Sequence, residues 1–484
     1  MSISGALSNA VSGLTVTARR LAVTSDNIAN ALTEGYAVRD VALEARNRSG
    51  GVRLDAVLRA QDPVLTAQRR EADADANAAS TTATLAAELN DAIGAFGEGD
   101  RLSAAAEAFD SALRRLADRP NDAILQSQAL QGARDLATAF NDASSGVQDV
   151  RSEADRRIAS LVDGVNADAE ALARVNRRIV ALPADDRARA LLIDEQERLT
   201  DRINAALPIA AEREADGRLT LRTREGLLLV GRGEPQALGF TRATAVGPQT
   251  TLQDGGVSGL TLGGRDITPD GPSAQAVSAG AIAALFVVRD ETAVALNADL
   301  DGAALDLVQR FQDPGLDATV TAPLAGLFSD AGNRPTAPPD AGLAGRLALP
   351  AILDDPTAGW RLRDGLYAAA QGPTGADGLL RDQIAALAAR RDAADVAAAP
   401  GPASLAERLA AIAESGDRLR LAADASASEA NARRATLAET EGEALAVDQD
   451  AELQALIALE QAYAANAQVI STANSMLQRL SEIV

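Results

Sequence analysis

The sequence has no cysteine, no histidine and no lysine among its 484 residues, and all 46 of its basic residues are arginine. The absence of cysteine excludes disulfides and thiolate catalysis, and the absence of histidine removes the commonest general base and most transition-metal ligands. Without lysine, the chain cannot form a Schiff base or a Walker-type phosphate loop. These absences exclude most classes of enzyme, and we expect neither a cofactor nor a metal.

Aromatic side chains, positive charge and long apolar runs are also scarce. Aromatics make up 2% of the residues although apolar residues make up 47%. Much of that apolar fraction is alanine, which suits close packing of helices better than a bulky globular core. The net charge of −22 argues against nucleic acid or an anionic membrane as partner. No apolar run reaches the length of about eighteen residues that predicts a membrane span, and residues 1–30 lack the pattern of a cleaved secretory signal.

Hydrophobic residues spaced by seven stand near both ends of the sequence. At one end they are Leu7, Leu14, Leu21 and Ile28, and at the other they are Leu456, Tyr463, Ile470, Leu477 and Val484. A strict spacing of seven keeps one narrow seam of a helix facing a partner helix. The polar residues between them are mostly Ser, Thr, Asn and Gln, which can be buried without stranding a charge. We therefore predict that the two ends pair with each other or with neighbouring subunits.

The middle of the sequence carries a third set of hydrophobic residues spaced by seven: Ile158, Val165, Leu172 and Ile179. It belongs to a helical pattern that begins near Asp122, just after Pro120, and is interrupted at Pro183. We interpret this third set as the buried core of a helical bundle within one chain.

The hydrophobic pattern changes along the chain from helix to strand and back to helix. Residues 4–32 predict an amphipathic helix, and residues 36–58 and 218–230 each alternate as hairpins do. Near the other end, residues 403–441 predict a helix, Gly442 permits a bend, and residues 449–484 predict the last helix.

We therefore predict a mainly α fold with a β-containing insert. A long helical rod or coiled coil is built from the N- and C-terminal segments, and one or two small β-rich domains lie outside it. The predicted domains are an axial helix with an extended segment over 1–62, a helical rod over 63–206, an outer β-containing insert over 207–375, and returning helices over 376–484.

Three pairs of carboxylates invite a catalytic interpretation: Asp354-Asp355, Asp185-Asp186, and Glu195 with Glu197. A catalytic pair needs a concave pocket that separates the two pKa values. An acidic chain carries such pairs by chance, so we interpret them as solvated side chains. A secreted adhesin or enzyme with coiled-coil ends is an alternative of a different class, and it predicts stable ends and a ligand pocket within 207–375.

Two groups of short motifs stand at opposite ends of the sequence. The N-terminal group contains Ser12-Gly13-Leu14, Asn27-Ile28-Ala29-Asn30 and Gly35-Tyr36. The C-terminal group contains Glu460-Gln461-Ala462-Tyr463, Asn466, Val469-Ile470-Ser471-Thr472-Ala473-Asn474 and Met476-Leu477. Together they resemble the axial proteins of the bacterial flagellum, which are the rod, hook and hook-associated proteins. The long helical middle, with Arg119-Pro120-Asn121-Asp122-Ala123, is similar to the hook–filament junction proteins of that family. A hook or rod protein is the first alternative.

The resemblance implies a structural protein of motility, and not an enzyme, that is secreted and stands in the extracellular flagellum at the hook–filament junction. It implies type III export through the flagellum itself and coiled-coil assembly of the terminal helices in a ring of copies. The implied partners are hook protein on one side, a second hook-associated protein or the filament on the other, and an export chaperone at the C-terminal helix.

The residues that we expect at the assembly interface come from both ends of the chain. They are Leu7, Leu14, Leu21, Asn27, Ile28, Asn30, Gly35, Tyr36, Leu456, Tyr463, Asn466, Ile470, Asn474, Leu477 and Val484.

Overall fold

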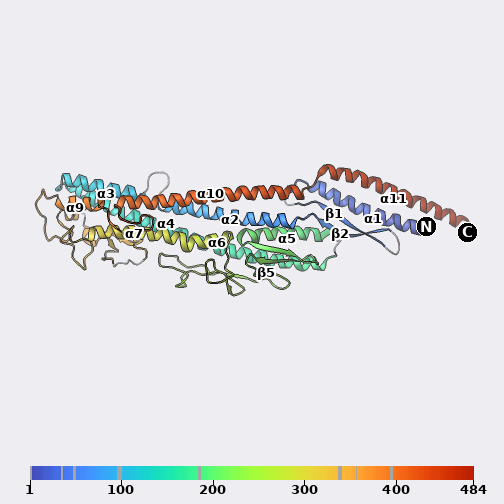
Figure 1. Cartoon of the computed structure of the whole chain (residues 1–484), viewed down its shortest axis with the longest axis horizontal. Coiled ribbons are helices and arrows are strands. Elements are labelled where there is room, and N and C mark those ends of the chain that lie inside the picture. The colour runs from blue at the N-terminus through green and yellow to red at the C-terminus, as the bar shows by residue number, and fades with distance from the viewer. Residues whose placement is uncertain are drawn as a thin grey trace. The chain divides into compact units, whose positions relative to one another are not determined.

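The computed structural model describes residues 3–33, 36–46, 51–94, 101–183, 187–335, 341–355, 357–392 and 396–483. The chain is mainly helical with small antiparallel sheets, which confirms the predicted fold class (Figure 1). It divides into two compact units, each built from separate stretches of sequence. Unit 1 comprises Met1–Ala76, Asp163–Leu238 and Ala430–Val484, and unit 2 comprises Asn77–Val162 and Gly239–Glu429.

Unit 1 contains the two terminal helices and two small sheets. Its helices are α1 (Ile3–Asn30), α5 (Arg187–Ala206) and α11 (Gln449–Ile483), with the adjoining parts of α2 (Pro63–Ala92), α4 (Ala123–Ala181) and α10 (Leu405–Leu445). Its strands are β1 (Arg39–Ala45), β2 (Val52–Arg59), β3 (Ile209–Arg213), β4 (Leu219–Thr223) and β5 (Leu228–Val230).

The sheets of unit 1 are antiparallel. Strand β1 pairs with β2, from Arg39 opposite Arg59 to Ala45 opposite Val52. Strands β3, β4 and β5 form a second sheet in that order. Both predicted hairpins are therefore confirmed, whereas β3 was not identified from the sequence pattern.

Helix α4 begins and is buried as its sequence predicts. The Asp122 carboxylate accepts hydrogen bonds from the N–H groups of Ile124 at 3.0 Å and Leu125 at 3.3 Å, which caps the helix. The predicted seven-spaced residues are each exposed by 2% or less: Ile158, Val165, Leu172 and Ile179. The interpretation of this set as core is therefore confirmed.

Unit 2 is a helical bundle with several short loops. Its helices are α3 (Arg101–Asp118), α6 (Gly280–Val287), α7 (Ala293–Gln312), α8 (Arg361–Asp364) and α9 (Gly378–Ala388), with the adjoining parts of α2, α4 and α10. A π-helical turn (Val288–Thr292) joins α6 to α7, and 3₁₀ turns form at Ala344–Arg346, Ala351–Leu353 and Ala358–Trp360. The short strands are β6 (Leu238–Gly239), where the chain passes from one unit to the other, β7 (Thr261–Leu262), β8 (Arg265–Asp266), β9 (Ser329–Asp330) and β10 (Leu347–Ala348).

Three phenylalanines and several arginines hold unit 2 together. The rings of Phe109, Phe311 and Phe328 are buried, with centroids 5.3 to 6.0 Å apart, a separation at which tilted and edge-on rings attract one another. Arg310 pairs with Asp306 at 2.8 Å and donates to the carbonyl oxygens of Ala386 and Ala389 at the C-terminal end of α9. A buried guanidinium with several donors thus satisfies carbonyls that the end of a helix leaves without a helical partner.

The break before the last helix does not fall at Gly442. Helix α10 continues through this residue to Leu445, and α11 begins at Gln449. The Asp448 carboxylate accepts from the N–H groups of Asp450 at 3.0 Å and Ala451 at 3.1 Å, so Asp448 caps α11. Among the helices that the structure describes, none is both long and apolar enough to cross a membrane.

Candidate assembly surface

Helices α1 and α11 lie side by side in unit 1 and run antiparallel (Figure 1). Two contacts set their register. The Asn27 amide donates to the Glu452 carboxylate at 2.7 Å, and Gly13 lies against the side chain of Asn466. These partners are two heptads apart on each helix, so one register holds along the pair. We refer to α1 and α11 as the terminal pair.

Gly13 permits the close approach of the two helices. A Cβ atom at this position would lie 3.0 Å from the Asn466 Oδ1 atom, closer than side chains normally come. Glycine costs helix stability because it has no side chain to restrict the unfolded backbone. Its place in the N-terminal motif therefore has a steric reason, which is the contact with the C-terminal motif.

The predicted seven-spaced ladders lie beside the buried seam of the terminal pair. In α11, Leu459 and Ala473 are buried, whereas Leu456 and Ile470 are half-buried and Tyr463 is exposed. In α1 the predicted residues are all half-buried: Leu7, Leu14, Leu21 and Ile28. Since a helix turns by about 100° per residue, a ladder displaced by three residues from the seam lies on its flank. Part of the surface of the described ladder side chains thus remains available to a further partner.

Asn27 joins three parts of unit 1 and is exposed by only 1%. Its Oδ1 atom accepts from the Tyr36 hydroxyl at 2.9 Å and from the Arg39 N–H at 3.1 Å. Its Nδ2 atom donates to the Arg39 carbonyl at 2.8 Å and to Glu452. Burial raises the pKa of Tyr36, so its hydroxyl stays protonated and can donate. The side chain of Asn27 therefore ties α1 to the start of β1 and to α11.

Asn30 closes α1 one turn later. Its side-chain amide donates to the Asp26 carbonyl at 2.8 Å, and its own carbonyl accepts from the Thr33 N–H at 2.9 Å. Of the other predicted interface residues, Asn474 and Leu477 are exposed, whereas Gly35 and Val484 lie outside the described residues.

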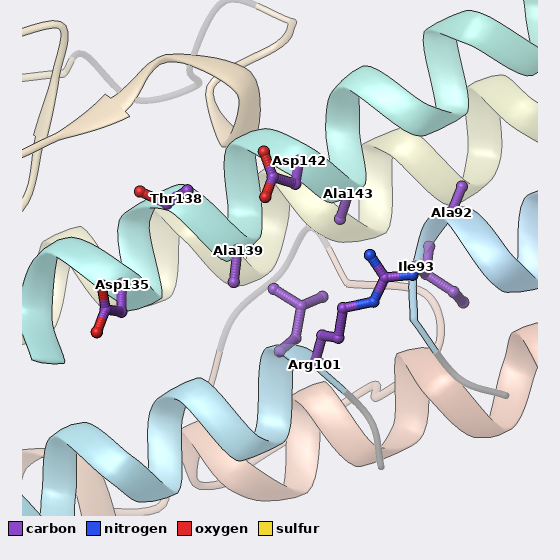
Figure 2. Close-up of a pocket in the computed structure, with 9 residues that line it drawn as sticks. Ala92, Ile93, Arg101, Asp135, Thr138, Ala139, Asp142 and Ala143 are labelled. Atoms are coloured by element: carbon purple, nitrogen blue, oxygen red, sulfur yellow. The ribbon is translucent and has the colours of Figure 1, made fainter. Parts of the chain in front are cut away.

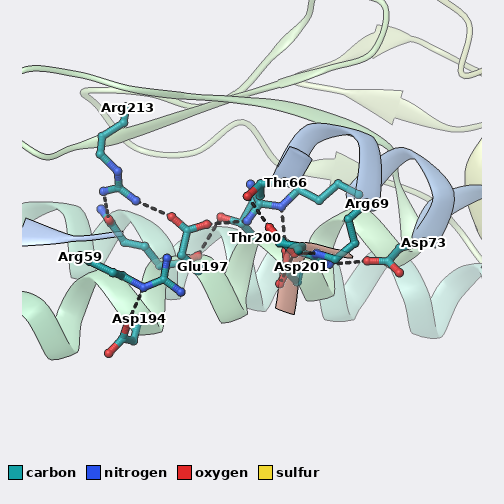
Figure 3. A network of polar contacts seen from close by, with 12 residues as sticks. Arg59, Thr66, Arg69, Asp73, Asp194, Glu197, Thr200, Asp201 and Arg213 are labelled. Carbon is teal, nitrogen blue, oxygen red and sulfur yellow. Dashed lines mark hydrogen bonds and ion pairs between the residues drawn. The ribbon is translucent and has the colours of Figure 1, made fainter. Parts of the chain in front are cut away.

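A network of arginines and carboxylates connects α5 to the neighbouring strands and to α2 (Figure 3). Asp194 of α5 binds Arg39, and it also accepts from Arg59 at 3.1 Å. One turn further, Glu197 binds both Arg70 and Arg213 at 2.6 Å. Burial alone would raise the pKa of Glu197, but the two guanidinium groups together hold it below its ordinary value.

The network continues from α2 to α10. Arg69 donates to three carboxylates, which are Asp201 at 3.0 Å, Asp73 and Glu441 of α10. Such multidentate pairs hold elements in register because a guanidinium offers its donors in a fixed plane. Glu197, which belongs to a suspected catalytic pair, is therefore a structural anion clamped between arginines.

The pocket drawn in Figure 2 offers little to a reaction. It lies in unit 2, has a volume of about 260 Å³ and is lined by five apolar residues, by Arg101 and Thr138, and by Asp135 and Asp142. Both aspartates are exposed to solvent. Within the described residues, no cluster of acidic side chains could hold a metal ion.

Two facing stretches of the terminal pair carry no charged side chain. The sequence has no acidic or basic residue over 3–18 or over 461–478, in a chain of net charge −22. Over the second stretch Tyr463, Val469, Met476 and Leu477 are exposed. An uncharged surface that exposes several large apolar side chains in so acidic a chain is typical of an interaction site.

Three family models match this chain. The model for the C-terminal part of flagellar basal body rod FlgEFG proteins matches residues 443–483, and the flagella basal body rod protein model matches residues 7–36. These two matches coincide with the terminal pair and define a flagellar axial protein. The helical domain of the flagellar hook-associated protein FlgK matches residues 86–318. The three matches together cover most of the chain, which is a structural component of the bacterial flagellum, outside the cell, rather than an enzyme, with a stretch similar to the FlgK helical domain.

Among solved structures, the chain is similar to the flagellar hook junction protein FlgK from Burkholderia pseudomallei, with 18% sequence identity and a TM-score of 0.44. The similarity covers 57% of this chain and 49% of that one, so the chain spans about half the length of the structure it matches. A comparison with curated proteins gave no match.

Proposed function

We propose that this chain joins the flagellar hook to the filament as a ring of copies. One observation carries the proposal: a match to the FlgK helical domain stands between two matches to axial termini. The terminal matches fall on α1 and α11, which pair with each other, so one module unites both ends of the matched sequence. In this proposal, hook protein lies on one side of the ring and a second hook-associated protein or the filament lies on the other.

The proposed assembly surface is the terminal pair with the segment that Asn27 ties to it. Half-buried ladder residues on the flanks would complete their burial against neighbouring copies: Leu7, Leu14, Leu21, Ile28, Leu456 and Ile470. Exposed residues would join them: Tyr463, Asn474 and Leu477. Asn27, Asn30, Tyr36 and Asn466 would fix the geometry of the pair, and Gly35 and Val484 complete the predicted set.

We also infer that the protein is exported through the type III channel of the flagellum, with a chaperone on α11 beforehand. The support is the exposed uncharged surface over 461–478, which would otherwise cause early self-association. The division into segments 1–62, 63–206, 207–375 and 376–484 stays a prediction of how the chain is used in the assembly.

The test is deletion of the gene in its source bacterium, followed by electron microscopy. Cells with hooks but no filaments, and with flagellin released into the medium, are the expected result, and the intact gene should restore filaments. Cells without hooks would assign the chain to the hook or rod instead. Intact motile filaments would overturn an axial role.

Limited proteolysis of the dilute protein distinguishes the proposed function from the second alternative, a secreted coiled-coil adhesin or enzyme. An assembly module that gains most of its burial from neighbours should be cut within α1 and α11 before unit 2 is cut. Terminal helices that outlast unit 2 in the free protein would favour the alternative.

A further inference from the structure

We propose that a groove between α1 and the β1–β2 hairpin receives the outward face of α11 from a second copy of this chain. The inference rests on the proposed function, because it names one contact by which copies would join in a ring.

The groove has a volume of about 950 Å³, and its lining residues belong to α1 or are Arg46, Val52, Arg53 and Leu54 of the hairpin. Leu7, Val11 and Leu54 give it an apolar floor, and Val11 is 48% exposed. Three arginines line the same groove: Arg19, Arg46 and Arg53. Its lining therefore combines apolar, hydroxyl and basic side chains, and of the arginines Arg53 also pairs with Glu44 of the same hairpin.

The groove lies on the side of α1 that faces away from α11. Gly13 contacts Asn466 of α11, whereas Val11 and Thr15, each two residues away, line the groove. Two residues correspond to about 200° around a helix. The α11 of the same copy cannot reach the groove without breaking the terminal pair.

The outward face of the first half of α11 has the complementary pattern. Leu453 is 47% exposed and Ile457 is 55% exposed, and the exposed carboxylates Asp450 and Glu460 stand one turn before and after them. We call these four residues the outward stripe. The buried Leu459 and Ala473 mark the opposite side of the helix, so the stripe points away from α1.

The pattern of charge and burial points to a second copy as the occupant. An apolar strip with acidic ends is complementary to a groove that is lined by apolar side chains and three arginines, and complementary charges set the register of such a contact. Groove and stripe are different surfaces, so each copy offers one to the next and the contact is head to tail. Head-to-tail contacts close into rings or extend into helices, which suits a ring between hook and filament.

Disulfide formation between copies tests the inference, because the natural chain has no cysteine. In one copy, the antiparallel register places Val11 and Ile457 about eleven residues apart along the pair, which is about 16 Å. A disulfide requires Cα atoms within about 7 Å. A bond between Val11→Cys and Ile457→Cys therefore reports a contact between copies.

The two single variants are produced together in the deletion strain, and the isolated flagella are oxidised. A covalent dimer is expected from the mixture and from neither variant alone. Leu421→Cys, at an exposed position of α10, replaces Ile457→Cys in the matched control and should give no dimer with Val11→Cys. Reversing the groove charge with Arg46→Glu should lower the yield of dimer severalfold.

A photo-crosslinking residue at position 457 gives a second reading that does not require disulfide geometry. Crosslinked peptides are expected to contain residues 7–22 or 46–54 of another copy. Filaments that form normally but crosslink elsewhere, or give no crosslink in either assay, would overturn this inference and leave the proposed junction role standing. Failure of the junction role would appear separately, as filaments on cells that lack the gene.

Discussion

Helices α4 and α11 use the same small and branched apolar residues, yet they bury them to different degrees. In α4 the side chains of Ile158, Leu172 and Ile179 are fully enclosed. In α11, among the side chains that the structure describes, Leu459 and Ala473 alone are buried. Helix α4 thus packs into a core within its own chain, whereas α11 still exposes most of its apolar side chains.

The difference shows how one chain can be stable alone and also prepared for assembly. Burial of apolar surface contributes about 25 cal/mol per Å², so a helix with two buried side chains gains little from its own chain. The terminal pair compensates with directional contacts, namely the hydrogen bonds of Asn27 and the close approach at Gly13. These contacts define the geometry and leave the hydrophobic gain to neighbouring copies.

The largest effect should come from the aromatic core of unit 2. Phe109→Ala removes a fully buried ring that contacts Phe311 and Phe328, and we expect it to lower the free energy of unfolding by about 3–5 kcal/mol. Leu477→Ala in α11 should change it by less than about 0.5 kcal/mol while impairing motility. Urea unfolding and swimming assays measure both. Equal costs at the two positions would contradict the comparison.

The next effect concerns the hydrogen bonds by which Asn27 ties α1 to β1 and α11. Asn27→Ala leaves the Tyr36 hydroxyl, the Arg39 backbone and Glu452 without a shared partner. Since a buried unpaired group costs about 1–3 kcal/mol, hydrogen-exchange protection of α1 should fall by about 2–3 kcal/mol. Ser25→Ala, at an exposed position of the same helix, is the control. Unchanged exchange in α1 would show that Asn27 does not hold the pair.

A smaller loss of stability is expected when α1 and α11 are forced apart at Gly13. Gly13→Val forces the Asn466 side chain to move, because the added Cβ would lie 3.0 Å from its Oδ1 atom. We expect a loss of about 1–2 kcal/mol, of which Asn466→Ala in the same chain recovers most. Gly164→Val on α4, where a Cβ meets open space, should be neutral or slightly stabilising. A double-mutant cycle from thermal unfolding measures the coupling, and additive effects would exclude the contact.

The seven-residue spacing predicted the helices and the existence of the terminal pair, but it located the seam imperfectly. Spacing by seven identifies a stripe, and a helix drifts by about 20° per heptad against that stripe. The actual seam of α11 runs through Leu459, and then through one polar and one small residue, Asn466 and Ala473. Hydrophobicity gives the last two little weight, so the sequence favoured the neighbouring ladder of larger side chains.

The arginine network and the groove could not be predicted from the sequence. Asp194 meets Arg39 and Arg59 across more than a hundred residues, and no local pattern links them. The complete replacement of lysine by arginine was a usable signal, because guanidinium groups suit buried and bidentate pairs. It indicated the kind of contact that would form, while the choice of partners depended on how α2, α5 and β3 come together.

The smallest effect is the acid dependence of that network. Arg70 and Arg213 hold the pKa of Glu197 below its ordinary value against the opposing effect of burial. A carboxylate with a lowered pKa contributes stability above the unfolded pKa of about 4.3, and this contribution is lost as the pH falls through the folded pKa. Burial raises the pKa of Asp73, which works in the opposite direction and masks part of the effect.

Glu197→Gln should therefore flatten the loss of stability in acid, measured by urea unfolding from neutral pH downward. Glu443→Gln at an exposed position should leave the slope unchanged. Equal slopes in the two variants would mean that the clamp on Glu197 contributes nothing to the acid response of unit 1.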